Sequence, residues 1–165
     1  MLDRQYARVM AKYNQWMNRK LYTLVQGIPD ELVYEDKSAF FKSVYGTLAH
    51  IIWADRIWMD RFKAHPRIEP ANMLDIASLV EIRQKLDAEI ISWAEGLDDE
   101  WLAQPLTWVS GMHQQTYTKP AWQLVAHFFN HQTHHRAQAG TLLTQMGLDI
   151  GITDLQMMPE LEQFN

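Results

Sequence analysis

The sequence predicts an all-α protein, a four-helix bundle with a small β-hairpin inserted before the last helix. Four long segments carry apolar residues at steps of three and four, which is the period of one face of an α-helix. Proline and glycine mark the interruptions between these segments. One stretch, "LTWVSGMHQQTYT", is instead rich in β-branched and aromatic residues. At 165 residues and 47% hydrophobic content, we expect one domain spanning residues 1–165.

The first two helices are predicted from Asp3 to about Gln26 and from about Ser43 to Lys63. "QGIPDE" ends the first, because a glycine followed by a proline does not continue a helix. The second should stop near "AHPRIEP", where two prolines lie in a polar stretch. The apolar stripe of the first helix comprises Tyr6, Val9, Met10, Tyr13, Met17, Leu21, Leu24 and Val25.

The third helix should begin at Ser78, because Glu81 follows three residues later as in a capping box, and should end at Gly96. The hairpin is predicted to pair residues 106–109 with residues 115–118 across "SGMH". The fourth helix is expected to take Thr118 as its cap, to hold Pro120 in its first turn, and to run to about Met146, before Gly147.

Composition excludes several classes of function. The net charge is −5 and the 15 Lys and Arg residues are scattered, so no basic stripe favours nucleic-acid binding. The absence of cysteine excludes disulfides, thiolate metal ligands and a cysteine nucleophile. Neither a signal peptide nor an apolar run long enough to span a membrane is found, so we expect a cytoplasmic protein without membrane contact.

The segment "HFFNHQTHHRAQ" holds four of the seven histidines within nine residues. His131 and His135 fall on the expected buried stripe of the fourth helix, where their rings should project side by side. Buried imidazoles need partners for their nitrogens, and a divalent metal would supply one for both. Hydrogen bonds to neighbouring helices would also satisfy them. A catalytic base with neighbouring groups and a chance cluster on a solvated face are the other interpretations of the segment.

A third ligand would strengthen the metal hypothesis, and His50 is the candidate. It lies midway along the second helix, in "TLAHIIWADRIW", beside apolar residues, although a lone histidine there is more often a satisfied core residue. His65, in a proline-rich loop, and His113, near the hairpin tip, are predicted to lie on the surface.

Missing carboxylates exclude two metalloenzyme classes. The fourth helix carries no Asp or Glu between Lys119 and Leu148, whereas a di-iron carboxylate site needs glutamates beside its histidines. A zincin protease needs the glutamate of HExxH, and "HQTHH" has Gln132 at that position.

Several motifs resemble the DinB family of metal-binding four-helix bundles. They are "YNQWMNRKL" in the first helix, "TLAHIIWADRIW" in the second, "LVAHFFNHQTHHRAQAGTLLTQMG" in the fourth and "GITDLQ" near the end. The most specific is H-x-x-x-H-R-x-Q at residues 131–138, and Ala137 departs from the glycine of many members. The resemblance covers nearly the whole chain. It implies an up-down-down-up helix order, frequent homodimers, and a triad of His50, His131 and His135 around one divalent ion.

Three protein ligands leave a coordination position open, as in catalytic rather than structural zinc sites. Relatives in the wider superfamily use such a metal to activate a low-molecular-weight thiol. We therefore expect a metal-dependent thiol S-transferase that takes a small thiol and an electrophile, with zinc, nickel, iron or manganese as the ion. The alternative is a non-catalytic protein whose ion joins the second and fourth helices. A metal-free interaction bundle would leave the buried imidazoles unexplained.

Five further residues are candidates for supporting roles. Arg136 would bind a carboxylate on the thiol, or else be a solvated surface residue. Gln138 would hydrogen-bond a ligand, or else be a polar core residue. His127 and His134 are candidate rim groups or proton shuttles. Asp55 would be a supporting carboxylate, or else a charge on the helix surface.

Overall fold

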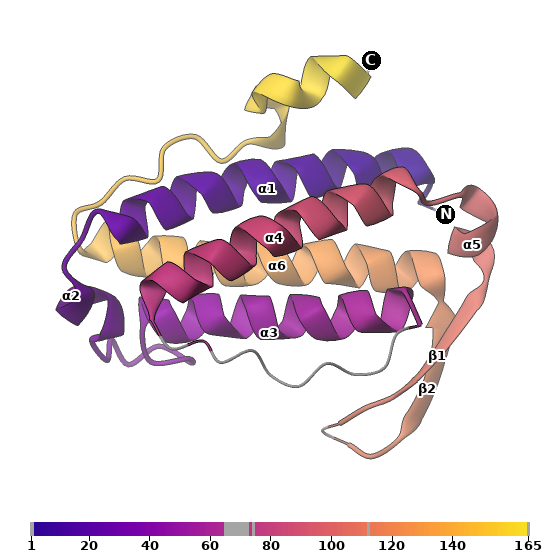
Figure 1. Ribbon diagram of the computed structural model, residues 1–165, viewed down its shortest axis with the longest axis horizontal. Helices are drawn as coiled ribbons and strands as arrows, with labels where there is room; N and C mark the ends of the chain where they lie inside the picture. Colours follow the sequence, from indigo (N-terminus) through magenta and orange to yellow (C-terminus); the bar gives the residue numbers. More distant parts are fainter. Residues whose placement is uncertain (1, 65–72, 74, 112, 165) are drawn as a thin grey trace.

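The computed structural model describes residues 2–64, 73, 75–111 and 113–164. Four long helices lie side by side (Figure 1). In the view of Figure 1, α1 and α6 run in one direction and α3 and α4 in the other. The predicted bundle, hairpin and up-down-down-up order are therefore confirmed. The long helices are α1 Arg4–Gln26, α3 Val44–Phe62, α4 Ile76–Glu95 and α6 Ala121–Gln145.

The core lies between these helices. Helix α1 packs against α4 and α6, and α3 packs against the same two helices. Burying a large apolar side chain contributes roughly 1.5–3 kcal/mol, so this core supplies most of the driving force for folding. Its largest fully buried apolar side chains include Leu48, Ile51, Ile52, Met59, Leu79, Ile90, Leu102, Phe128, Phe129 and Leu143.

The starts of the first two long helices agree with the sequence, and the start of α4 does not. Asp3 and Ser43 cap α1 and α3 by accepting backbone amide hydrogen bonds. Helix α4 is capped by Asp75 instead of Ser78. The capping box forms because the Asp75 carboxylate accepts from the Ser78 amide while the Ser78 hydroxyl accepts from the Asp75 amide. Ser78 therefore occupies the third helical position predicted for Glu81.

The hairpin comprises β1 Pro105–Val109 and β2 Thr116–Pro120, paired antiparallel. The predicted cap Thr118 lies inside β2, where its hydroxyl is 2.8 Å from that of Thr107. Because Thr118 is paired within the hairpin, it does not cap the helix. Helix α6 begins at Ala121, and its cap residue Pro120 makes no side-chain hydrogen bond.

Shorter elements that the sequence did not predict complete the described chain. Helices α2 Asp30–Tyr34 and α5 Asp99–Ala103 follow α1 and α4, and 3-10 turns η1 Leu155–Met157 and η2 Pro159–Phe164 lie near the end. This C-terminal segment passes along α1 (Figure 1), where Met158 packs against Tyr13 and Met17.

Helix α3 ends at Phe62, close to the predicted Lys63. Most of the predicted stop "AHPRIEP", with His65, lies outside the described residues.

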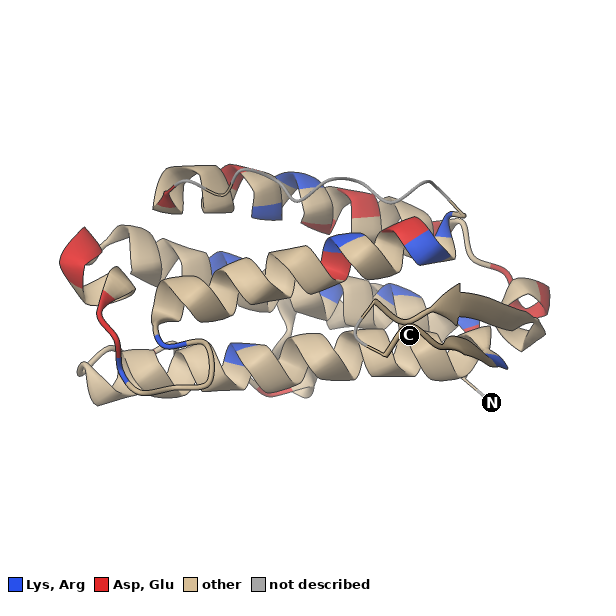
Figure 2. Cartoon of the chain, turned by 90° about the horizontal axis from the view of Figure 1, so that it is seen from below, with Lys and Arg blue, Asp and Glu red and all other residues tan. Residues whose placement is uncertain are grey.

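Acidic and basic residues are interspersed along the helices in Figure 2, in agreement with the scattered charges of the sequence. Among the described residues, no helix combines the length and apolarity that crossing a bilayer requires.

Candidate metal centre

Three histidines from two helices converge at one place on the bundle. His50 comes from α3, and His131 and His135 come from successive turns of α6. One ring nitrogen from each lies within 4.8 Å of the other two. The Nε2 atoms of His50 and His131 are 3.3 Å apart. The packing of α3 on α6 thus brings together residues separated by about eighty positions in the chain.

The cluster lies at the edge of the core and not at its centre. His50, His131 and His135 are half-buried, whereas Gln132 and Arg136 on the same helix are buried. The prediction that His131 and His135 occupy the buried stripe is therefore only partly right. Successive α-helical residues are about 100° apart, so the residue next to each histidine, and not the histidine itself, faces the centre of the bundle.

The histidines are neutral at pH 7. Burial and the neighbouring His135 lower the pKa of His50 to about 4. Burial, together with the other histidines, lowers the pKa of His131 to about 3. Burial also lowers the pKa of His135, although its hydrogen bond to Gln138 opposes this shift. Neutral imidazoles carry the free lone pairs that a metal ion needs.

The donor set fits a divalent metal. Zinc–imidazole bonds of 2.0–2.1 Å in tetrahedral geometry place neighbouring nitrogens about 3.3 Å apart. The His50–His131 separation has this value, and the remaining pairs lie within 4.8 Å of one another. Among the described residues, no fourth His, Cys, Asp or Glu joins the group. One coordination position would therefore remain for an exogenous ligand.

Gln138 orients one of the three rings. Its Oε1 is 2.7 Å from Nδ1 of His135, and its Nε2 is 3.2 Å from Nε2 of His134. Because the amide oxygen can only accept, Nδ1 of His135 carries the proton and Nε2 is left with a lone pair. The Gln138 amide group donates to His134, so that residue serves as an acceptor. Gln138 thus makes the hydrogen bond to His135 that one of its two predicted alternatives requires.

Aromatic side chains surround the cluster. Phe41 stacks on His50 with ring centroids 4.0 Å apart, and it meets His135 edge-on at 5.4 Å. Trp53 lies 5.8 Å from His50. Phe41 was not predicted from the sequence, although "AFFK" places two adjacent phenylalanines in the otherwise polar segment that precedes α3. These apolar side chains shield part of the site from water, which strengthens electrostatic interactions there.

His127 extends the cluster along α6. Its ring centroid is 5.8 Å from that of His131 and 5.2 Å from that of Trp58. Partial burial and the nearby Arg61 lower the pKa of His127, so it is also neutral at pH 7.

His113 is exposed near the hairpin tip, as predicted.

Two candidate residues lie elsewhere than predicted. Asp55 is neither a surface charge nor hydrogen-bonded to a histidine, because it is buried and accepts a 2.6 Å hydrogen bond from Arg83 of α4. Arg136 is buried as well, and it donates to Asn14 of α1 and to Thr133. Both residues turn into the bundle because α1 and α4 pack against the faces of α3 and α6 that carry them.

Comparisons with known proteins agree with this architecture. The model of the DinB family matches residues 1–163. Protein DinB of Bacillus subtilis (strain 168) is 24% identical over 166 residues, which cover 90% of this chain and 91% of that protein. The crystal structure of a DinB-like protein from Bacillus cereus ATCC 10987 aligns with a TM-score of 0.63 at 16% identity, covering 85% of this chain and 90% of that one. At this identity the structural likeness concerns the fold alone.

Proposed function

The chain belongs to the DinB family, and from this membership and the three converging histidines we propose that it binds one divalent metal ion and activates a small thiol for transfer to an electrophile. The observation that carries the proposal is the convergence of one nitrogen each from His50, His131 and His135 within 4.8 Å. The candidate ions are zinc, nickel, iron and manganese. Imidazole is a common ligand for the first three.

The open position distinguishes this donor set from a structural zinc site, which four protein ligands usually close. A bound divalent ion lowers the pKa of a thiol that contacts it, so that the nucleophilic thiolate exists at neutral pH. The chain contains no cysteine and would therefore rely on an external thiol. The thiol loses its proton, its sulfur forms a bond to an electrophilic carbon, and the leaving group departs with its electron pair.

The residues around the histidines would bind and position the reactants. Gln138 accepts a hydrogen bond from Nδ1 of His135, which would leave Nε2 of that ring free to bind the ion. Phe41 and Trp53 offer apolar surface beside His50, where the carbon skeleton of an electrophile could pack. Neutral His127 is a candidate acceptor for the proton that the thiol loses, because it lies one turn before His131.

A second candidate function is a non-catalytic protein whose ion joins α3 to α6. The same observation favours it, because His50 lies on one helix and the other two histidines on the other. Such an ion would stabilise the folded chain by about 2.7 kcal/mol at a free concentration one hundred times its Kd.

The first test is the metal content of tag-free protein by elemental mass spectrometry. We expect about one equivalent in the wild type, little in His50→Ala or His135→Ala, and wild-type content in the control His113→Ala. Equal metal content in all four proteins would exclude the triad as the binding site.

The second test separates the two functions. Metal-loaded protein is incubated with cysteine, coenzyme A or glutathione and with an alkylating electrophile, and thioether formation is followed. Catalysis that His135→Ala abolishes would support the transferase. A chelator that lowers the unfolding midpoint of a protein inactive with every thiol would support the structural ion.

A further inference from the structure

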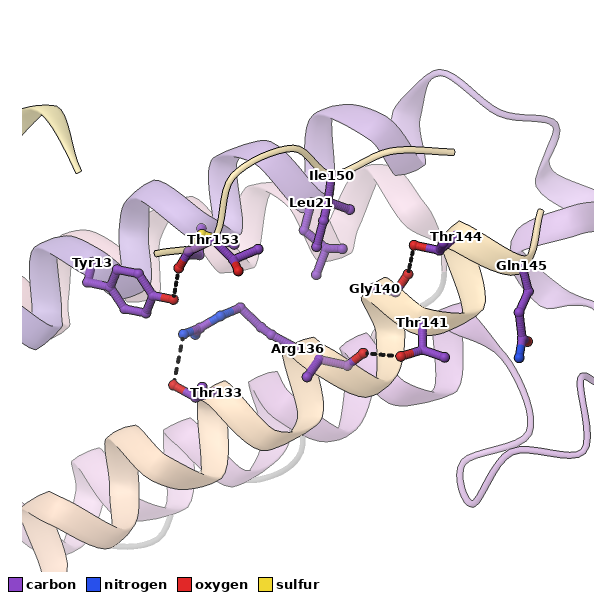
Figure 3. A pocket seen from close by; sticks show the side chains of 12 residues that line it. Tyr13, Leu21, Thr133, Arg136, Gly140, Thr141, Thr144, Gln145, Ile150 and Thr153 are labelled. Carbon is purple, nitrogen blue, oxygen red and sulfur yellow. Dashed lines mark hydrogen bonds between the residues drawn. The ribbon is translucent and has the colours of Figure 1, made fainter. Parts of the chain in front are cut away.

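A second site lies on another face of α6, away from the histidines. A cavity of about 390 Å³ opens between α1, α6 and the segment that follows α6 (Figure 3). From His135, the cavity residues Gly140 and Thr144 lie roughly 140–180° around the helix axis. Cavities of roughly 300–1,000 Å³ are the usual size for small organic ligands.

Most of the cavity wall is apolar. Met17 and Leu21 contribute from α1, Ala137 and Gly140 from α6, and Ile150 from the following segment. That segment is held against α1 at two points, because Tyr13 donates a 2.6 Å hydrogen bond to the Thr153 carbonyl and Lys20 donates to the Ile152 carbonyl. The wall is therefore built from three separate parts of the chain.

Arg136 places a charge at one end of this cavity. In Figure 3 its guanidinium lies between Thr133 on α6 and the Tyr13–Thr153 pair. The side chain is only 5% exposed. An arginine guanidinium stays protonated at neutral pH, so this end of the cavity carries a positive charge.

The direct partners of Arg136 are uncharged. It donates to the Asn14 amide oxygen and the Thr133 hydroxyl, and no carboxylate lies within ion-pair distance among the described residues. The nearby buried carboxylates Asp55 and Asp87 are both paired directly with Arg83. A buried cation gains most from an anion in direct contact.

Three threonine hydroxyls that line the cavity are already satisfied. Thr141 and Thr144 donate to carbonyls of their own helix, as Thr133 does. Arg136 is then the group that would select a ligand. One cation at the end of an apolar cavity matches one negative charge on an apolar tail.

We propose that this cavity binds a small monocarboxylate with an aliphatic tail, whose carboxylate pairs with Arg136 and whose tail lies along Leu21, Gly140 and Ile150. The proposed metal ligands take no part in this binding.

The test is calorimetric titration of the metal-loaded protein with octanoate, and with octanol as an uncharged probe of the same length. Octanoate should bind at one site at least roughly tenfold more tightly than octanol, because a charge-assisted hydrogen bond is worth more than a neutral one. The Gly140 amide resonance should shift on binding, and that of Gly96, far from the cavity, should not.

Variants locate the binding. Ala137→Trp fills the cavity from an exposed wall position and should weaken octanoate binding roughly tenfold or more. Gln123→Trp places the same side chain at an exposed position of α6 outside the cavity, and it should bind as the wild type does. Arg136→Met should abolish the preference over octanol, and if that variant fails to fold, Ala137→Trp still decides the question.

His135→Ala distinguishes this cavity from the metal centre, because a carboxylate is also a metal ligand. Octanoate binding that persists in His135→Ala and is lost in Ala137→Trp would support the second site. Loss in His135→Ala, an unchanged affinity in Ala137→Trp, or equal binding of octanoate and octanol would overturn it.

Discussion

The bundle contains two groups of polar side chains that differ in their burial and in their partners. The histidine cluster gathers three chemically alike groups at the edge of the core, with ring nitrogens 3.3 Å apart in the closest pair. The second group, which we call the charge network, comprises Asn14, Asn18, Asp55, Arg83 and Asp87 and lies inside the core. The two groups differ in whether the protein itself supplies the partners of their polar side chains.

The charge network pairs its charges internally. Arg83 lies 2.6 Å from Asp55 and 2.9 Å from Asp87. Asn14 and Asn18 both donate to the same oxygen of Asp87. Burial alone would lower the pKa of Arg83, but Asp87 and Asp55 more than offset this and hold it above its ordinary value.

The histidine cluster contains no such ion pairs. Its members depress each other's pKa, and no described carboxylate joins them. The contrast teaches that polar groups in a bundle indicate a ligand site where the protein itself does not supply their ionic or metal-binding partner. Paired charges, in comparison, connect helices to one another and require no ligand.

The largest expected effect comes from breaking the charge network. Arg83→Met should lower the free energy of unfolding by about 3–5 kcal/mol, because it leaves two carboxylates buried without their partner. Urea unfolding measures the change. The matched control is Lys63→Met in the exposed pair with Glu89, which should cost at most about 1 kcal/mol. Equal effects of the two substitutions would remove the distinction between buried and exposed pairs here.

The next effect concerns the residue that orients His135. Gln138→Leu should weaken zinc affinity roughly 10- to 100-fold, because the ring loses the acceptor that fixes its proton on Nδ1. Gln138→Glu keeps an acceptor and should restore most of the affinity. Competition with a chromophoric chelator measures both. A variant that loses stability without losing zinc would assign Gln138 to the fold alone.

The smallest effect is in the pH dependence of metal binding. Histidines with ordinary pKa values would release the metal near pH 6.5 and below. The lowered pKa values of His50 and His131, about 4 and 3, mean that protons compete only in more acidic solution. Zinc affinity should therefore fall roughly threefold or less between pH 7 and pH 6.

The same pKa values affect the metal-free protein. Unfolded histidines take up protons from about pH 6.5 downward, whereas these folded ones resist protonation until about pH 4 or 3. The unfolded state then binds more protons, so the free energy of unfolding should fall as the pH drops through this window. A steep loss of zinc between pH 7 and pH 6, with flat stability, would contradict the expected burial of the cluster.

The sequence by itself determined the features that depend on local periodicity. Apolar residues at steps of three and four located the four long helices, and the β-rich stretch located the hairpin. The four-residue spacing of His131 and His135 placed their rings on one side of a helix, because the helical turn alone sets that relation. The capping by Asp3 and Ser43 was also local, since each side chain accepts a hydrogen bond from an amide three residues away.

Only the tertiary structure decided which faces of the helices meet. Periodicity gives angles within one helix, but not where a neighbour packs, so the burial of Asp55 and Arg136 could not be read from α3 or α6 alone. His50 was chosen by family resemblance, and its approach to His131 depends on the docking of α3 on α6. Thr118 does not cap α6, because it lies in a strand and its hydroxyl pairs with that of Thr107, 11 residues earlier. Contacts between distant segments depend on the packing of whole elements, and no short window of sequence contains that information.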